Sequence, residues 1–187
     1  MNKIGTQALE TERLLLRRFT PEDAPAMYEN WCKDPLVSKY LRFTAYQSVD
    51  DAVQTLSQWV PQYEKDPMFL HWCIALKDGT AIGSLGLMDA AENDQSAEIG
   101  YCIGREWWGA GYVTEALKAV FQYAFEKVEL NRLEACHSIN NQASGRVMQK
   151  AGMTLYGHPR QKYICILGPQ DCDAYEILRS DWLANHT

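Results

Sequence analysis

The residues with the clearest chemical potential surround a glycine turn in the middle of the chain. Gly109 and Gly111 immediately precede a stretch in which apolar residues recur at helical spacing, so the turn leads into the N-terminus of a helix. Glycine lets the backbone adopt a positive φ and approach a ligand closely, and the first N–H groups of a helix have no intrahelical partners. Such a helix end favours the binding of a phosphate group.

Two common phosphate-binding patterns do not fit this turn. Gly104 and Gly109 have the glycine spacing of a Walker loop, but Ala110 and Gly111 follow where lysine and then Ser or Thr are required. The dinucleotide-binding pattern needs a third glycine three positions after Gly111, where Thr114 stands. A turn that only joins a strand to a helix is the plain structural alternative.

The elements that must position this turn are predicted from hydrophobic periodicity and turn residues. Asp78–Gly79 between two apolar runs indicates a β-hairpin. The helix after Gly111 should bury its apolar positions, which are Val113, Ala116, Leu117, Val120, Phe121, Ala124, Phe125 and Val128. Strands are expected over Glu12–Phe19, Phe69–Leu76, Thr80–Met88, Ala97–Ile103, Arg132–His137, Gln161–Leu167 and Cys172–Arg179, with the last two closing the sheet.

Helix ends carry their own signals. Thr20 and Ser48 are each followed three residues later by aspartate, which is typical of a capping box at a helix start. Asn141 is a favourable N-cap and Gly152 a favourable C-terminal stop for a further helix. Within that helix, the positions expected to face the core are Ala143, Val147 and Ala151.

Length and composition indicate one globular domain over residues 1–187. The 187 residues are 47% hydrophobic and 22% charged, and no apolar run is long enough to span a bilayer. The first residues have neither the basic start nor the apolar centre of a signal peptide. We therefore expect a cytoplasmic protein without a membrane partner.

The cysteines and the charge balance exclude further classes. The six cysteines are far apart in the sequence and mostly have apolar neighbours, so we expect reduced thiols rather than a zinc site or a disulfide framework. A net charge of −6 argues against a nucleic-acid partner and mildly favours cationic partners such as amines.

The segments on both sides of the glycine turn resemble the GNAT superfamily of N-acetyltransferases, and especially its ribosomal-protein N-acetyltransferase (RimJ/RimL-type) branch. The resemblance is carried by Glu98–Tyr101 before the turn and by Trp108–Ala116 after it. A second signature is the helix that contains Asn141, Ser144, Arg146, Lys150 and Gly152, which is similar to the family's helix beside the pantetheine arm. Glu106 replaces the usual first residue of the superfamily's loop, but acidic residues are common there in this branch.

This resemblance implies a mixed α/β GNAT fold, with a central, mostly antiparallel sheet that is splayed at the acetyl-CoA site and flanked by helices. It implies an N-acetyltransferase that moves acetyl from acetyl-CoA to a primary amine by direct attack in a ternary complex, with no metal. The acceptor stays open between a protein N-terminal α-amine and a small amine of the polyamine or aminoglycoside type. A CoA-binding module without turnover is a further alternative, and a homodimer is among the assemblies that the resemblance allows.

The resemblance also implies which residues contact the coenzyme. Backbone groups of the strand before the turn should bind the pantetheine arm and the glycine loop should bind the pyrophosphate, while Arg105 and Arg146 are further candidates for phosphate contacts. The cofactor-binding set is Ile99, Tyr101, Ile103, Trp108, Gly109, Ala110, Gly111, Tyr112, Asn141, Ser144 and Lys150.

Two side chains are candidates for proton transfer in this reaction. By resemblance, Ser144 would donate a proton to the coenzyme A thiolate, although a serine three residues after an N-cap commonly bonds only its own helix backbone. Glu98 would accept the amine proton, although strand alternation could equally direct it to solvent. His71 is a second candidate base, but a single histidine within an apolar strand is more often structural.

Overall fold

The computed structural model of the protein describes residues 1–186. The strands are β1 (Leu9–Glu10), β2 (Leu14–Arg17), β3 (Leu70–Leu76), β4 (Ala81–Ala91), β5 (Ser96–Ile103), β6 (Arg132–Ser138), β7 (Thr154–Gly157), β8 (Tyr163–Cys165), β9 (Gly168–Gln170) and β10 (Cys172–Leu178). The helices are α1 (Ala24–Met27), α2 (Pro35–Ser38), α3 (Val49–Trp59), α4 (Gln62–Lys65), α5 (Tyr112–Tyr123), α6 (Gln142–Ala151) and α7 (Arg179–His186). Within residues 1–186, none of these helices has the length and apolar character needed to cross a membrane.

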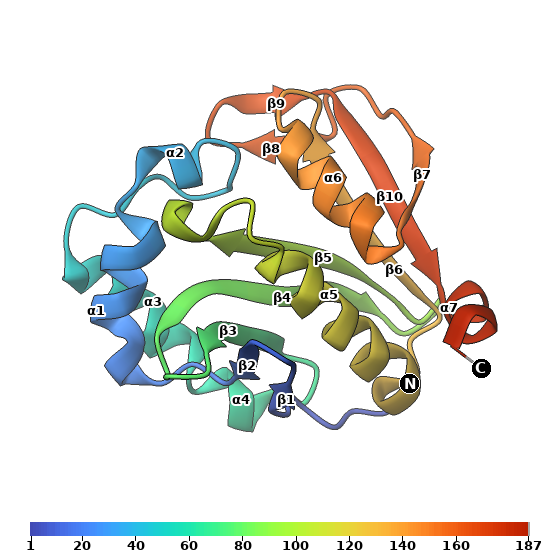
Figure 1. Ribbon diagram of the computed structural model, residues 1–187, viewed down its shortest axis with the longest axis horizontal. Coiled ribbons are helices and arrows are strands. Elements are labelled where there is room, and N and C mark those ends of the chain that lie inside the picture. The colour runs from blue at the N-terminus through green and yellow to red at the C-terminus, as the bar shows by residue number, and fades with distance from the viewer. Residues whose placement is uncertain (187) are drawn as a thin grey trace.

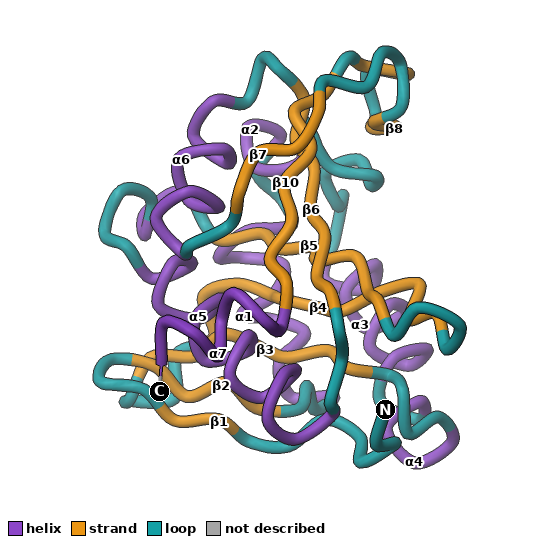
Figure 2. The backbone as a smooth tube through the Cα atoms, turned by 90° about the vertical axis from the view of Figure 1, so that its right-hand side faces the viewer, coloured by secondary structure: helices purple, strands orange, loops and turns teal. Residues whose placement is uncertain are grey.

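One eight-stranded sheet in the order β1-β2-β3-β4-β5-β6-β10-β7 forms the centre of the protein (Figure 1). All neighbouring strands in it are antiparallel except β5 and β6. These two pair in parallel only at Ser96–Glu98 with Arg132–Glu134, although both strands continue beyond this point. Figure 2 shows β6 and β10 rising away from the direction of β3, β4 and β5. The predicted mixed α/β fold with a splayed, mostly antiparallel sheet is confirmed.

Helices cover the two faces of the sheet and bury separate clusters. The larger cluster lies between the sheet and α5, α6 and α7, and it includes Trp72, Leu85, Phe121 and Phe125. The smaller cluster joins α1 and α3 to the opposite face of β3 and includes Trp31, which is 1% exposed. Helices therefore pack on both faces of the sheet and fix the positions of β5 and β6 on either side of the opening between them.

Helix α5 confirms the strongest prediction from periodicity. Gly111 is its N-cap residue, with φ +83°, and all eight apolar positions expected to face the core are 0–7% exposed. The last turn, Ala124–Val128, widens to π-helical geometry and ends at Glu129, where φ is positive. The capping boxes at Thr20 and Ser48 are present as predicted.

Helix α6 differs from its prediction in two details. Of the three positions predicted to face the core, Ala151 is buried and Val147 packs partly buried against the core, but Ala143 is exposed. Gly145 and Met148 are buried in addition. The reason is a close contact: a Cβ at Gly145 would lie 2.4 Å from Nε2 of His137 on β6. Asn141 occupies the N-cap position but makes no side-chain capping bond, and Gly152 ends the helix with φ +105° as predicted.

The prediction that Gln161–Leu167 helps to close the main sheet was wrong. This segment contributes to a separate hairpin of β8 and β9, which reverses next to Gly168, where φ is +84°. The outer strand of the main sheet is instead β7, a short and mostly exposed strand with no buried face to reveal it in the sequence. The hairpin predicted at Asp78–Gly79 is present, and it joins β3 to β4.

Candidate active site

The candidate site begins where the parallel pairing of β5 and β6 stops. Glu98 opposite Glu134 is the last pair, and β5 then continues to Ile103 with β4 as its partner along the other edge. The segment Ile99–Ile103 therefore presents backbone N–H and C=O groups to the gap between β5 and β6. Such an edge can bind an extended ligand as an added strand would bind.

The two faces of this gap carry different side chains because residues alternate along β5. Ile99, Tyr101 and Ile103 pack toward the cluster beneath α5, and the two isoleucines are only 4% and 8% exposed. Both can therefore contact a ligand mainly through the backbone. Glu98 is an odd number of residues away from each of them, so its carboxylate lies on the opposite face.

Tyr101 and Ser144 connect β5 to α6 across the gap. The Tyr101 hydroxyl lies 2.7 Å from Ser144 Oγ and 3.2 Å from the Ser144 carbonyl oxygen, to which it can donate. Loss of solvation raises the pKa of Tyr101 well above its ordinary value. Tyr101 is therefore a neutral donor, and within residues 1–186 the Ser144 hydroxyl is paired with it rather than with its own helix backbone.

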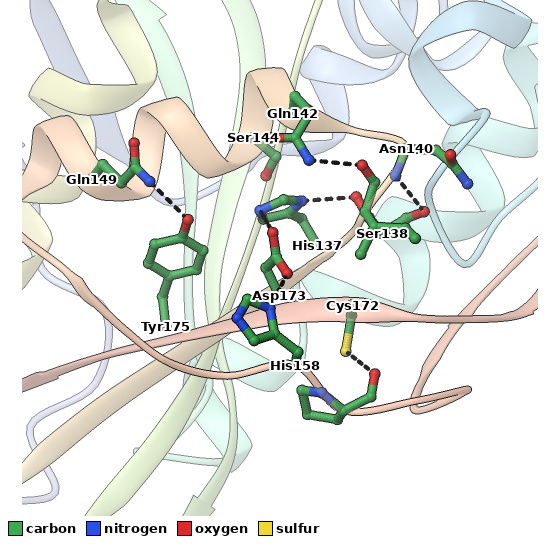
Figure 3. Close-up of polar contacts among 12 residues, drawn as sticks. His137, Ser138, Asn140, Gln142, Ser144, Gln149, His158, Cys172, Asp173 and Tyr175 are labelled. Carbon is green, nitrogen blue, oxygen red and sulfur yellow. Dashed lines mark hydrogen bonds and ion pairs between the residues drawn. The ribbon is translucent and has the colours of Figure 1, made fainter.

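Helix α6, which carries Ser144, is held against β6 and β10 by side-chain contacts (Figure 3). Gln149 Nε2 donates to the Tyr175 hydroxyl at 2.9 Å, and the His137 ring stacks on Tyr175 with 5.7 Å between centroids. His137 Nδ1 donates to the Ser138 carbonyl at 2.8 Å, which holds the ring under Gly145. These contacts set the position of Ser144 relative to β6.

The glycine loop is held by residues that the sequence did not reveal. Arg13 Nη1 donates to the Ala110 carbonyl at 3.0 Å, and its guanidinium forms a 2.7 Å ion pair with Glu115 and lies 4.4 Å from the centre of the Tyr112 ring. Thr11 also donates to Glu115 at 2.6 Å. Because more than a hundred positions separate Thr11 and Arg13 from Glu115, no local sequence signal could have paired them.

This loop has the geometry needed for an anion. Gly109 and Gly111 have φ values of +76° and +83°, and nothing lies within 4 Å of the place where a Cβ of Gly109 would stand. The first N–H groups of α5 follow directly and lack intrahelical partners. Trp108, half exposed, donates from Nε1 to the Ile103 carbonyl at 2.9 Å and so links the loop to the end of β5.

Glu98 lies on the other side of the gap in a polar setting. Its side chain is 31% exposed, and Oε1 accepts a bond of 3.2 Å from Arg42 Nη2. Arg42 belongs to the segment that follows α2. The carboxylate thus faces Arg42 and stays partly open to solvent.

Two further candidates, His71 and Arg105, are engaged with other partners. His71 is enclosed by aromatic rings, with Trp59 at 4.2 Å between centroids, and this burial lowers the pKa of His71 to about 4. It is a core histidine bonded to Ser84 at 3.2 Å. Arg105 forms an ion pair of 2.8 Å with Asp34.

Besides Ser144, the candidates on α6 are Asn141 at its N-cap, the exposed Arg146 and Lys150 near its C-terminus. Asn141 is next to the gap with its side chain free of a capping bond. Lys150 lies in the last turn, where it borders a groove of about 750 Å³ together with Lys118 and Glu115 of α5. Within residues 1–186, no group of His, Cys, Asp or Glu side chains is arranged to hold a metal ion.

The arrangement suits acyl transfer from an extended thioester that carries phosphate groups. The gap can take an extended arm, and the glycine loop can take a pyrophosphate. A carboxylate on one face and a hydroxyl pair on the other could accept and donate protons at the same reacting centre. Side chains of β5 and α6 meet across the gap at Tyr101 and Ser144, whereas Glu98 lies on the opposite face with Arg42 and His71 is bonded to Ser84.

Comparison with known proteins agrees with this geometry. Residues 13–154 match the family described as the acetyltransferase (GNAT) domain. The chain is 31% identical over 172 residues to the uncharacterized N-acetyltransferase YoaA of Bacillus subtilis (strain 168), covering 91% of this chain and 96% of that protein. It is 31% identical over 85 residues to the [ribosomal protein uS5]-alanine N-acetyltransferase of Escherichia coli (strain K12), covering 45% and 43% of the two chains.

A solved structure shows the same fold. The ribosomal L7/L12 α-N-protein acetyltransferase RimL, solved in complex with coenzyme A, superposes with a TM-score of 0.81 at 18% identity, covering 92% of this chain and 98% of that chain. The predicted resemblance to ribosomal-protein N-acetyltransferases is confirmed by these relatives.

Proposed function

Because the chain belongs to the acetyltransferase (GNAT) domain family and is an acetyl-CoA-dependent N-acetyltransferase, we propose that its acceptor is the N-terminal α-amine of a protein or peptide. One observation carries the proposal: the sheet opens at Glu98, with this carboxylate on one face and the Tyr101–Ser144 pair on the other. A relative named for acetylating the alanine of a ribosomal protein supports this class of acceptor.

The coenzyme supplies an activated acetyl thioester, and the residues around the gap fit it. Gly109, Ala110 and Gly111 with the N-terminus of α5 would hold the pyrophosphate. The backbone of Ile99, Tyr101 and Ile103 would hold the extended arm along the free edge of β5. Trp108, Tyr112 and Asn141 would border this path. Lys150 would approach a further phosphate from a groove that it lines with Lys118 and with four carboxylates, Glu10, Glu115, Glu126 and Asp181.

Glu98 and Ser144 would divide the proton transfers between the two faces. Glu98 would accept the proton of the attacking amine, directly or through a water molecule. Ser144 would donate to the departing thiolate, with Tyr101 holding its hydroxyl in place. An α-amine has a pKa near 8 and is partly neutral at physiological pH, so a partly exposed carboxylate suffices as the base.

The whole chain, residues 1–187, would act as one catalytic domain in the cytoplasm, where ribosomal proteins are available as acceptors. A peptide α-amine differs from a polyamine in carrying a carbonyl group next to its first carbon. The segment around Arg42 offers hydrogen-bond donors on the Glu98 side of the gap, which favours an acceptor with such carbonyl groups.

The test is release of free coenzyme A thiol in the presence of different acceptors. The panel contains a peptide with a free N-terminus, the same peptide with a blocked N-terminus and one lysine, spermidine and an aminoglycoside. We expect release to depend on the free N-terminus. Release only with spermidine or the aminoglycoside would identify a small-amine enzyme, and coenzyme binding without any acceptor-dependent release would identify a binding module.

A further inference from the structure

The contact between Arg42 and Glu98 is loose compared with the pair formed by Arg17 and Asp23. It consists of one bond of 3.2 Å, and the Arg42 side chain is 55% exposed. Arg17 instead binds Asp23 through two bonds of 2.8 and 2.7 Å, with a side chain that is 25% exposed. Paired bonds fix an arginine, whereas a single exposed contact contributes little to stability. The Arg42 side chain can therefore leave Glu98 easily.

The backbone that carries Arg42 is held in place, in contrast to its side chain. The Tyr163 hydroxyl donates to the Tyr40 carbonyl at 2.6 Å, and the Ile166 N–H donates to the Leu41 carbonyl at 2.9 Å. Both donors belong to the β8–β9 hairpin, which crosses from the far half of the sheet. The two residues before Arg42 are thus fixed, so exchange of its partner requires only side-chain rotation.

Arg42 also borders a groove on the Glu98 side of the gap. The groove has a volume of about 780 Å³, and its lining includes Arg42, Gln47, Asp51 and Ile166. The carboxylate in the groove lining, Asp51, accepts hydrogen bonds from the backbone N–H groups of Gln47 and Ser48 at 2.7 and 3.2 Å. It is therefore engaged in capping a helix rather than free to bind an amine. Among the described residues that line the groove, only Arg42 carries a positive charge. Its guanidinium also contacts Glu98, which does not line the groove.

We propose that Arg42 occupies the place of the acceptor's ammonium group on Glu98 and is exchanged for it when the acceptor enters from this groove. The inference rests on the proposed function, because it assigns Glu98 to the acceptor amine. After exchange the guanidinium needs new acceptors, and its five N–H groups match the carbonyl oxygens that lie beside a peptide α-amine. A polyamine has no carbonyl group and brings further positive charge close to Arg42.

Arg42 is therefore a specificity-determining residue that favours amines next to a carbonyl group over polycations. Like charges that are brought together at a binding site weaken the binding of the wrong partner. The cationic Arg42 therefore disfavours spermidine, which carries several positive charges. Removal of the guanidinium should relieve this penalty for spermidine. For a peptide, easier access to Glu98 and the lost carbonyl contacts should largely offset one another.

The experiment compares kcat/KM for an N-terminal peptide and for spermidine in wild type, Arg42→Met, Arg42→Lys and Lys39→Met. Lys39 is the matched control, because it is a cation of the same segment whose ammonium lies over the Tyr40 ring at 5.2 Å rather than on Glu98. We expect Arg42→Met to lower the peptide-to-spermidine ratio by about tenfold, through a lower KM for spermidine. Arg42→Lys should fall in between, and Lys39→Met should retain the wild-type ratio.

A second arm uses Glu98→Gln, in which no carboxylate is present for the two cations to share. In this background Arg42→Met should change the ratio much less. Three outcomes would overturn the inference alone: an unchanged ratio in Arg42→Met, an equal shift in Lys39→Met, or a full shift that persists in Glu98→Gln. Absence of acetyl transfer to any amine by the wild type would overturn the proposed function and the inference together. Circular dichroism and calorimetric coenzyme A binding verify that each variant is folded and competent.

Discussion

The Tyr101 hydroxyl lies 2.7 Å from Ser144 Oγ although 43 positions separate the two residues in the chain. The contact exists because β5 and β6 part after Glu98, which leaves Tyr101 directed across the gap toward α6. It makes the serine of α6 and the tyrosine of β5 one hydrogen-bonded unit at the place proposed for the thiolate. The first prediction depends on this unit.

Ser144→Ala should lower kcat by about 10²- to 10⁴-fold, which is the usual contribution of a general acid. Tyr101→Phe should have a smaller effect of roughly tenfold, because its hydroxyl only positions Ser144 and its raised pKa keeps it protonated. Steady-state kinetics measures both, and calorimetry should show unchanged acetyl-CoA affinity.

A more activated acyl donor with a better leaving thiol provides the control for this assignment. It should rescue Ser144→Ala more than a Gly111 variant, since only the serine variant has lost a proton donor. Wild-type kcat in Ser144→Ala, together with a melting temperature lowered by a few degrees, would leave the serine with a structural role only.

Gly111→Val should abolish acetyl-CoA binding while the protein stays folded. Gly111 has φ +83° at the N-cap of α5, where a branched side chain is strained and would stand in the path of the pyrophosphate. The matched control is Gly79→Val, because Gly79 has φ +94° in the β3–β4 hairpin, away from the gap. Calorimetric titration and thermal melting should show similar destabilisation in both variants and lost affinity only at Gly111. Equal affinities would place the pyrophosphate elsewhere.

Glu98→Gln should reduce kcat/KM and remove the acidic limb of its pH profile, since glutamine cannot accept the amine proton. Coenzyme A affinity should not change, because Glu98 lies on the face opposite Tyr101 and Ser144. The pH dependence of kcat/KM for a peptide acceptor measures this. An acidic limb that persists in the variant would show that another group, or bulk water, accepts the proton.

His71 should make the protein less stable in acid. Its pKa is lowered to about 4 by burial, so between pH 6.5 and 4 the unfolded chain binds a proton at this residue and the folded protein does not. The stability that depends on neutral His71 is therefore present above pH 6.5 and is lost as the pH falls toward 4, by about 3 kcal/mol.

Urea unfolding of wild type and His71→Gln across this range measures the effect. The free energy of unfolding of the variant should depend less on pH than that of wild type. His158→Gln is the control, because the His158 side chain is 70% exposed. Parallel pH profiles for wild type and His71→Gln would contradict the assignment.

Periodicity predicted the parts of the fold that depend on local spacing. The buried face of α5 was correct at every position, because a helix between a sheet and a second helix must bury one continuous stripe. The hairpin at Gly79 was correct because the turn requires a positive φ. Short segments such as β7 and the β8–β9 hairpin have no buried stripe and gave no reliable pattern.

The site was only partly predictable for the same reason. Gly109, Gly111 and Ser144 were proposed from local spacing or resemblance, whereas the partners of Glu98 and Glu115 come from distant segments. Arg42 and Arg13 are ordinary surface arginines in the sequence, and only the fold brings them to the gap and to the loop. The exposure of Ala143 on α6 was not predicted, because the close approach of Gly145 to His137, a residue of another element, decides which side of the helix faces the sheet.

The position of the acetyl group on an acceptor that offers two amines shows whether the enzyme acts on a protein N-terminal α-amine through Ser144. A peptide with a free N-terminus and one internal lysine is incubated with the enzyme and acetyl-CoA at neutral pH, and fragment-ion mass spectrometry locates the product. We expect a single acetyl group on the α-amine, formed in wild type and nearly absent in Ser144→Ala. Acetylation of the lysine alone, or equal product in the two proteins, would contradict it.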